Sequence, residues 1–537
     1  MKSFGNRHEF KHNSINKNNP SIKKLINRAI DLHFQGNIKE AIKHYQYLIN
    51  QGVADHSVFS NYGGILKSCG KLQEAELSFR KALELNPNFA NAYSNLGNVL
   101  RDLGQLQEAE KCIRRAIKLN PKFADAFSNL GNVLLDLGKL QEAELSFRKA
   151  LELNPNFANA HNNLGTLYKD LGKLQEAELS FRKAIKLNPN FANAYCNLGN
   201  VFNDLGILQK AEMYTSRAIE LNPNSETSNL NLAYILSDLG KLDELTNLSK
   251  SIIQSSSINE GYKFRALIHI TIAYLLKKNF SETFSNLNKI KELEKAGIIK
   301  TIKNEINRKH ASTFSKFLSH LYPLLQKENA NNNLKVIPHI GESHCLSFSH
   351  QIVCLDSTNQ NIQPVLITGG KAWHFANKKY NRWKDSLNEQ LKKHNYSDKV
   401  FISFGEIDCR KEEGILTYTN KQNKTLSDVC EKTINEYLNY MEITLSPHYS
   451  KRYYFGVPAP IRIVGLPEKL DLQRIELIKL YNSILKTKVL LKGSYFLDVY
   501  QLTSDKNGEN NNFYMCDYTH LSPKCLSILF QAHLCKP

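Results

Sequence analysis

A 34-residue period of glycines runs through the first half of the chain, and this strict period constrains the fold more than any other feature. The series is Gly36, Gly70, Gly104, Gly138, Gly172, Gly206 and Gly240. A second small position keeps the same step at Ala29, Gly63, Gly97, Gly131, Gly165, Gly199 and Ala233. A third runs through Ala41, Ala75, Ala109, Ala143, Ala177 and Ala211, and Leu245 closes it. The period predicts seven copies of one supersecondary unit that stack on one another.

Each unit is predicted to be a pair of antiparallel helices. Small residues leave room where the two helices approach, and the turn glycine is expected to take a left-handed conformation that ends the first helix. Prolines just beyond the second helix stop its propagation, at Pro87, Pro121, Pro155, Pro189 and Pro223. We therefore expect an all-α array over residues 22–259, preceded by a flexible tail at residues 1–21.

The repeat text, for example NLGNVLRDLGQLQEAEKCIRRAIKLNPKFA from Asn95, closely resembles the tetratricopeptide repeat (TPR) family. The resemblance covers all seven units. The first unit lacks the proline and the last has Leu245 at a normally small position, as expected of terminal repeats. The resemblance implies a superhelical scaffold with a protein or an extended peptide in its groove.

An asparagine keeps the same step within the first helix of each unit, which would form a ladder along one face. The ladder asparagines are Asn61, Asn95, Asn129, Asn163, Asn197 and Asn231. A similar ladder in the TPR arrays of protein glycosyltransferases holds the backbone of extended peptides, a task suited to a carboxamide because it both donates and accepts hydrogen bonds. Alternatively, these side chains bond neighbouring helices or face solvent.

Two further regions follow the array. Residues 260–332 keep helical patterning without the strict period, as in YKFRALIHITIAYLLKKNF, and predict capping helices and a linker. After the polar segment KENANNNLK the texture changes to short apolar runs: KVIPHI, PVLITGG, KVFISFG, YYFGVPAP and SYFLDVY. Buried strands that alternate with helical segments predict a three-layer α/β domain with a parallel sheet over residues 333–537.

Polar motifs stand at the ends of three predicted strands and before the last helix. They are Gly341-Glu342-Ser343, Gly369-Gly370, the segment GEIDCR from Gly405 to Arg410, and the pair Asp517 and His520 in CDYTHLSP. Because ligands bind beyond the carboxyl ends of strands in such sheets, these motifs are candidates for a catalytic site.

The four motifs resemble those of the SGNH (GDSL-like) hydrolase family, over roughly residues 333–537. GES stands where that family has Gly-Asp-Ser, and Asp517 and His520 match its Asp-x-x-His block. The resemblance implies that Ser343 is the nucleophile, His520 its general base and Asp517 the residue that orients the imidazole. Backbone N–H groups of Ser343 and of Gly369 or Gly370 would stabilise the oxyanion.

The third motif departs from the family pattern Gly-x-Asn-Asp. Ile407 occupies the asparagine position and cannot donate a hydrogen bond, so either Arg410 substitutes or the site is impaired. Loss of one oxyanion donor typically costs about 100-fold to 1000-fold in rate. Four aromatic residues after the second strand, Trp373, His374, Tyr380 and Trp383, predict either a platform for a sugar or acyl group or core packing.

Composition limits the partners. The 70 Lys and Arg residues exceed the 51 Asp and Glu residues, but the excess of +19 is spread over the chain, which predicts a solvated surface and no nucleic-acid partner. No apolar stretch has membrane-spanning length and the N-terminus has no secretory signal, so a cytoplasmic location and no membrane span are predicted. The ten cysteines form no CxxC pair, and neither a metal site nor a cofactor is expected.

Two functions remain open. The chain is predicted to be a serine esterase or acyltransferase that acts on an acyl ester, such as an acylated carbohydrate, and is held near its partners by the repeats. The alternative is a non-enzymatic adaptor whose C-terminal domain kept the fold but lost turnover. A peptide glycosyltransferase, suggested by the repeats alone, is disfavoured because the C-terminal strands carry no Gly-rich nucleotide-sugar signature.

Overall fold

The computed structural model describes residues 20–302 without a break and most of residues 305–537. The residues outside this description are 1–19, 303–304, 306–307, 309–310, 313, 319–333, 342–343, 348–349, 368–369, 378–380, 394–396, 406–408, 410–414, 423, 461–467, 512, 516–519 and 523–524. By its internal contacts the chain divides into two compact units, Met1–Ala194 and Tyr195–Pro537. Each unit is described by itself.

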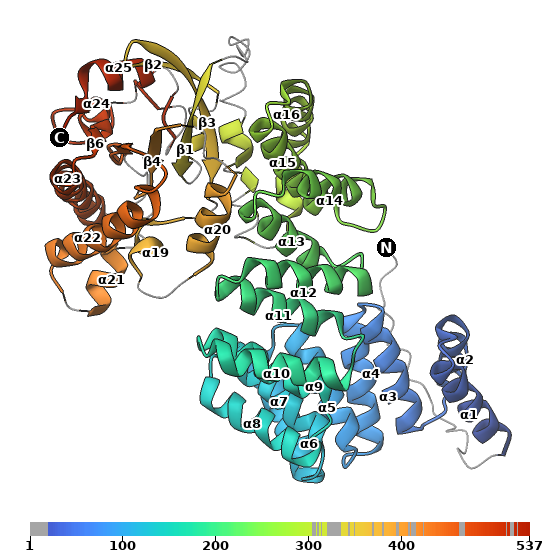
Figure 1. Cartoon of the computed structure of the whole chain (residues 1–537). Coiled ribbons are helices and arrows are strands. Elements are labelled where there is room, and N and C mark those ends of the chain that lie inside the picture. The colour runs from blue at the N-terminus through green and yellow to red at the C-terminus, as the bar shows by residue number, and fades with distance from the viewer. Residues whose placement is uncertain are drawn as a thin grey trace. The chain divides into compact units, whose positions relative to one another are not determined.

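The first unit consists of consecutive helix pairs, one for each of the first five predicted repeats (Figure 1). The helices are α1 (Pro20–Phe34), α2 (Ile38–Asn50), α3 (His56–Ser68), α4 (Leu72–Leu85), α5 (Ala90–Asp102), α6 (Leu106–Leu119), α7 (Ala124–Asp136), α8 (Leu140–Leu153), α9 (Ala158–Asp170) and α10 (Leu174–Leu187), and α11 (Ala192–Asp204) begins at its end. In α8, Ala143, Phe147 and Ala150 are fully buried at the spacing of a helical turn, which gives the helix one apolar face. The predicted all-helical array is confirmed.

The turn inside each pair is closed by the predicted glycine. All seven of these glycines have positive φ angles, between 61° and 80°. After α5, the N–H of Gly104 donates to the carbonyl of Arg101 at 2.9 Å, and the N–H of Gln105 donates to the carbonyl of Leu100 at 2.8 Å. These bonds satisfy carbonyls at the helix end, and a residue with a Cβ would be strained in this backbone conformation.

The two helices of a pair approach most closely at the second small position. A Cβ atom on Gly131 would lie 2.5 Å from the ring of Phe147 on the next helix, and one on Gly165 would lie 2.8 Å from the ring of Phe181. The third small position is filled by fully buried alanines, of which Ala177 is an example. The periodic small residues therefore follow from close packing within each pair.

The second unit begins with the sixth and seventh repeats and continues into a further helix pair. After α11 come α12 (Leu208–Leu221), α13 (Glu226–Asp238), α14 (Leu242–Gln254), α15 (Glu260–Leu276), α16 (Phe280–Lys295) and the 3-10 helix η1 (Ile298–Thr301). α15 starts one full repeat period after α13, and Asn259 caps it as Ser225 caps α13. The sequence analysis missed this step because α15 has 17 residues where α13 has 13, and its turn is made by Lys278, a left-handed residue that is not glycine.

A seven-stranded sheet follows these helices. Its strands are β1 (Lys335–Gly341), β2 (Ile352–Leu355), β3 (Thr358–Leu366), β4 (Lys399–Ser403), β5 (Lys451–Phe455), β6 (Tyr495–Leu497) and β7 (Leu534–Cys535), in the order β2-β3-β1-β4-β5-β6-β7. The five central strands are parallel, and the two edge strands are antiparallel to their neighbours. Numbered along the chain, the parallel strands have the order 2-1-3-4-5, which is typical of a doubly wound sheet.

The sheet is mixed, whereas the sequence analysis predicted a parallel one. β2 and β3 form a hairpin whose turn residues, Asp356 and Ser357, have φ angles of 50° and 61°. Positive φ at both central positions is the type I′ turn that joins antiparallel strands. The turn lacks the glycine that usually marks it, so β3 was predicted only from Pro364 onward instead of from Thr358.

Helices cover both faces of the sheet. They are α18 (His344–Ser347), α19 (Ala372–Ala376), α20 (Arg382–Leu391), α21 (Ile415–Gln422), α22 (Leu426–Leu445), α23 (Glu468–Leu491), α24 (Val499–Thr503) and α25 (Cys525–Ala532). Successive residues of β4 alternate between two cores: Val400 and Ile402 pack with α22 and α23, and Phe401 packs with α25. This alternation gives the region its three layers.

Within the second unit, α20 packs against the turns of the sixth and seventh repeats. The carboxylate of Asp385 accepts a hydrogen bond from the N–H of Leu208 at 3.0 Å. The hydroxyl of Ser386 donates to the carbonyl of Asp238 at 2.8 Å. These contacts join the last predicted repeats to the α/β region, which explains why both belong to one compact unit.

Candidate functional site

The chain changes direction across the sheet beside β1. From β1 it passes through the hairpin to β3 on one side, and then crosses to β4 on the other. Gly341 at the end of β1 is in register with Leu366 of β3 and with Ser403 of β4. The three strands therefore end level with one another, and doubly wound sheets bind ligands at such a point. The motifs GES, GG and GEIDCR follow these three strand ends.

The structure describes only part of the predicted catalytic set. Gly370 and His520 are described, whereas the other residues lie outside the description: Ser343, Asp517, Gly369 and Arg410, together with Glu342, Glu406, Ile407 and Asp408. In sequence, Ser343 falls between the end of β1 and the start of α18. The proposed roles of the undescribed residues stay predictions.

Glycines at the strand ends are required by close contacts. A Cβ atom on Gly341 would lie 2.9 Å from the carbonyl oxygen of Ser403, and one on Gly370 would lie 2.9 Å from the ring of Phe404. Gly405 has a φ of 126°, which favours glycine. The ends of β1, β3 and β4 thus pack against one another without intervening side chains.

A buried histidine that the sequence analysis did not single out connects two of these strands. His339 of β1 is fully buried, and its Nε2 lies 2.9 Å from the hydroxyl oxygen of Ser403 at the end of β4. Its ring stacks on Phe455 of β5 with 4.9 Å between ring centroids. The contact with Ser403 helps to hold the end of β4 beside β1. The available signal was a single histidine inside an otherwise apolar strand, KVIPHIG.

His520 is buried against the ring of Phe317. Its side chain is 3% exposed, and its ring centroid is 4.1 Å from that of Phe317. Two residues after it, the N–H of Ser522 donates to the carbonyl of Tyr514 at 2.7 Å. A buried imidazole beside a phenyl ring is shielded from water, a suitable setting for a general base whose substrate must exclude solvent.

The aromatic residues after β3 divide between packing and exposure. His374 stacks on Trp383 with an interplanar angle of 7°, and burial, followed by the charges of Lys371 and Arg382, lowers the pKa of His374 to about 3. Trp373 is 39% exposed and contacts Tyr418 with 5.2 Å between centroids. Tyr380 lies outside the described residues. Of the three aromatics that the structure describes, Trp373 is therefore the most exposed.

The ladder asparagines make bonds between neighbouring repeats. Nδ2 of Asn129 donates to the Ser94 hydroxyl at 3.0 Å, and Nδ2 of Asn163 donates to the Ser128 hydroxyl at 3.5 Å, each 35 residues earlier. In the second unit, Nδ2 of Asn231 donates to Oδ1 of Asn200 at 2.7 Å. At these positions the asparagines therefore bond neighbouring helices, as the alternative to peptide binding predicted.

The same asparagines keep unused hydrogen-bonding capacity. A carboxamide has two N–H donors and an acceptor oxygen, and the bond from Asn129 or Asn163 uses one donor. Both side chains are partly exposed, as are Asn61, Asn197 and Asn231, and Asn95 is exposed. Bonding between helices fixes the orientation of each amide without covering it, so both interpretations of the ladder are compatible.

Neither a metal cluster nor a membrane span is found in the part of the chain that the structure describes. No group of three or more His, Cys, Asp or Glu side chains there is placed to hold a metal ion. No described helix is both long and apolar enough to cross a membrane. The expectation that the protein needs no cofactor stays a prediction.

The repeats are similar to known TPR regions. Residues 26–257 match the TPR family described as the cilia and flagella-associated protein 70 C-terminal domain. PilF of Pseudomonas aeruginosa is 20% identical, over 37% of this chain and 90% of PilF, with a TM-score of 0.33. A thermophilic TPR protein of Thermus thermophilus is 22% identical, over 34% of this chain and 98% of its own, with a TM-score of 0.32. YrrB, described as a TPR protein with an unusual peptide-binding site, is 27% identical, over 34% of this chain and 95% of its own, with a TM-score of 0.26.

No curated protein matches the chain in sequence. The family match and the repeat geometry together establish that the chain carries a TPR-type repeat array, followed by a C-terminal region with a mixed sheet.

Proposed function

We propose that the protein is a TPR scaffold whose α/β region acts as an SGNH-like serine esterase or acyltransferase on an acyl ester, such as an acylated carbohydrate. The observation that carries this proposal is topological. The three motifs GES, GG and GEIDCR follow the level ends of β1, β3 and β4, which are adjacent in the sheet, at the point where such sheets bind ligands.

In the proposed reaction, the Ser343 hydroxyl attacks the acyl carbon while His520 takes its proton, and Asp517 orients the imidazole. The carbonyl oxygen becomes an oxyanion, which the N–H groups of Ser343 and of Gly369 or Gly370 stabilise, with Arg410 in place of the missing asparagine. The leaving alcohol receives the proton from His520. Water or an acceptor alcohol then releases the acyl group from Ser343 by the reverse sequence.

Labelling with a fluorophosphonate probe tests this proposal. The wild type should be labelled, and Ser343→Ala should lose the label. Ser483→Ala, which removes an exposed serine of α23, serves as the matched control and should be labelled like the wild type. Equal labelling of the wild type and Ser343→Ala would exclude Ser343 as the nucleophile.

A second candidate function is a non-enzymatic adaptor, and Ile407 at the asparagine position favours it. An adaptor would not hydrolyse activated esters such as p-nitrophenyl acetate. Hydrolysis that disappears in both Ser343→Ala and His520→Ala would rule this function out.

For the repeats, we propose that the ladder holds a protein segment in extended form. The support is the partly exposed amides of Asn129 and Asn163, each of which uses one N–H donor for its bond to the neighbouring repeat. Peptides selected from a library by the wild type should bind less to a triple variant in which Asn95, Asn129 and Asn163 are replaced by Ala. The matched triple control replaces three exposed turn asparagines, Asn88, Asn156 and Asn190. Equal losses in both triple variants would contradict a specific role for the ladder. The cytoplasmic location stays a prediction.

A further inference from the structure

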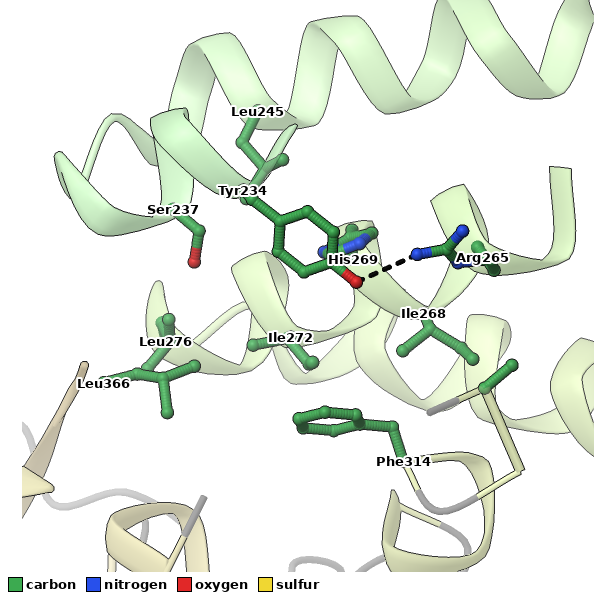
Figure 2. A pocket seen from close by; sticks show the side chains of 11 residues that line it. Tyr234, Ser237, Leu245, Arg265, Ile268, His269, Ile272, Leu276, Phe314 and Leu366 are labelled. Carbon is green, nitrogen blue, oxygen red and sulfur yellow. Dashed lines mark hydrogen bonds between the residues drawn. The ribbon is translucent and has the colours of Figure 1, made fainter. Parts of the chain in front are cut away.

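A hollow lies within the second unit where α13, α14 and α15 meet Ala311, Phe314 and the end of β3 (Figure 2). It encloses about 560 Å³ of space, including the open volume at its mouth. None of the predicted catalytic or ladder residues lines it.

The wall of the hollow is mainly apolar. Most of the residues that line it are apolar: Leu245, Ile268, Ile272, Leu276, Ala311, Phe314 and Leu366 (Figure 2). Such a wall favours a ligand with an aliphatic or aromatic body, because the body leaves water on binding.

One charged side chain stands in this apolar surrounding. Arg265 of α15 is 4% exposed, and its Nη2 donates to the hydroxyl of Tyr234 at 2.9 Å, as the dashed line in Figure 2 shows. Its Nη1 is buried without a hydrogen-bond partner, and among the described residues no carboxylate forms a salt bridge with it. The guanidinium also faces the ring of Tyr262, with 5.9 Å to the ring centroid, but an aromatic ring does not neutralise it. A buried charge without a counter-charge is unfavourable, so the guanidinium is set up to receive an anion.

The other titratable group in the wall adds no second positive charge. His269 lies next to Tyr234 with 4.9 Å between ring centroids. Burial, followed by the charge of Arg265, lowers the pKa of His269 to about 4, so its imidazole is neutral at physiological pH. The single guanidinium charge matches one monoanion.

The position of Arg265 continues the sequence register of the asparagine ladder. Arg265 stands one repeat period after Asn231, and Tyr234 stands one repeat period after Asn200. α15 begins in step with α13, so Arg265 occupies the ladder position of the eighth helix pair. The ladder's last position thus carries a charge where the earlier ones carry amides.

We propose that this hollow binds a carboxylate carried on a short apolar group, with the carboxylate on Arg265 and the apolar group against the aliphatic wall. A planar guanidinium can donate two parallel hydrogen bonds to a carboxylate, and here one nitrogen is already held by Tyr234 while Nη1 is available. The ligand can be a free short-chain acid or the apolar C-terminal residue of a peptide, since both present the same chemistry. The proposal does not depend on hydrolase activity.

Isothermal titration calorimetry of the full-length protein tests the proposal with four probes. The acids are 4-methylpentanoate and N-acetyl-leucine, and their neutral controls are 4-methylpentanamide and N-acetyl-leucinamide. At least one acid should bind about 10-fold or more tightly than its amide, because the amide cannot pair with the guanidinium. Preference for N-acetyl-leucine identifies a chain terminus as the source, and preference for 4-methylpentanoate identifies a free acid. Equal binding of each acid and its amide, or no binding of either acid, overturns the proposal.

Three variants place the binding at Arg265. Arg265→Gln should abolish acid binding, and Arg265→Lys should weaken it about 10-fold, because a lysine keeps the charge but loses the planar fork. Arg217→Gln removes an exposed arginine of α12 that pairs with Glu220, and it should bind like the wild type. Without ligand, Arg265→Gln should unfold at the same or a higher temperature than the wild type, because it removes an uncompensated buried charge. The proposal is overturned if both Arg265 variants unfold at a lower temperature than the wild type and Arg265→Lys still binds the acid as strongly as the wild type. Arg265 would then have a structural role.

Discussion

Asp238 should make the stability of the second unit depend on pH. It is the last residue of α13, its side chain is 3% exposed, and its carbonyl accepts the hydrogen bond from Ser386 of α20. Burial, opposed in part by the charge of Arg382, raises the pKa of Asp238 from 3.8 to about 7. The folded unit therefore favours the protonated, neutral carboxyl.

The sign follows from the direction of the shift. Because the pKa of Asp238 is higher in the folded chain, the unfolded chain binds fewer protons than the folded chain between pH 4 and pH 7. The contribution of Asp238 to the unfolding free energy is therefore fully present below the unfolded pKa, and it is lost as the pH rises through 7. A shift of about 3 units corresponds to about 4 kcal/mol of unfolding free energy, of which about 3 kcal/mol falls between pH 5 and pH 8. Asp238→Asn keeps the shape of the neutral acid and should remove this loss.

Urea denaturation followed by tryptophan fluorescence measures the effect. Both tryptophans of the chain, Trp373 and Trp383, lie in the second unit, so the signal reports on that unit alone. At pH 8 Asp238→Asn should be more stable than the wild type, and the difference should shrink by about 3 kcal/mol on going to pH 5. Asp243→Asn is the matched control, since its carboxylate is 79% exposed, and its pH profile should parallel that of the wild type. Parallel profiles for Asp238→Asn and the wild type would refute the reasoning.

Two other predictions concern packing and ion pairing. Gly131→Ala places a methyl group against the Phe147 ring and should lower the stability of the first unit by about 1–3 kcal/mol. Gly64→Ala adds a methyl group that meets nothing within 4 Å, so it should leave the stability unchanged or raise it by up to about 1 kcal/mol. Urea unfolding followed by circular dichroism compares the two variants, and equal effects would contradict the packing argument. Arg452→Ala removes the ion-pair partner, at 2.8 Å, of the largely buried Glu442 carboxylate, which keeps hydrogen bonds from the hydroxyls of Tyr454 and Ser494. The second unit should lose about 3 kcal/mol of stability in the tryptophan assay, and a loss below about 1 kcal/mol would contradict this argument.

The repeat array was predictable because its determinants are local. The positive φ of Gly104 and the space that Gly131 leaves for Phe147 involve residues within one helix pair, and the same pair recurs at a fixed period. The eighth pair escaped because its turn lies at Lys278, four residues later than the period requires and without a glycine.

The α/β region was predictable in its layers but not in its edges. Apolar runs such as that of β4 predict buried strands, yet a run of residues does not say which strand lies beside it. The hairpin of β2 and β3 depends on a turn at Asp356 and Ser357 that carries no strong sequence signal. The contact between His339 and Ser403, 64 residues apart, exists only because β1 and β4 are neighbours in the sheet.

The sequence by itself determined the helix pairs, their turns and the identity of the motifs, because each depends on residues that are close along the chain. Tertiary structure decided that the strands followed by three of the motifs end level with one another, that Asp238 is buried beneath α20, and that Arg265 stands in an apolar hollow without a salt bridge to any described residue. These properties depend on burial and on partners supplied by distant segments. The charge state of an acid or a guanidinium is set by that surrounding, which no local pattern encodes.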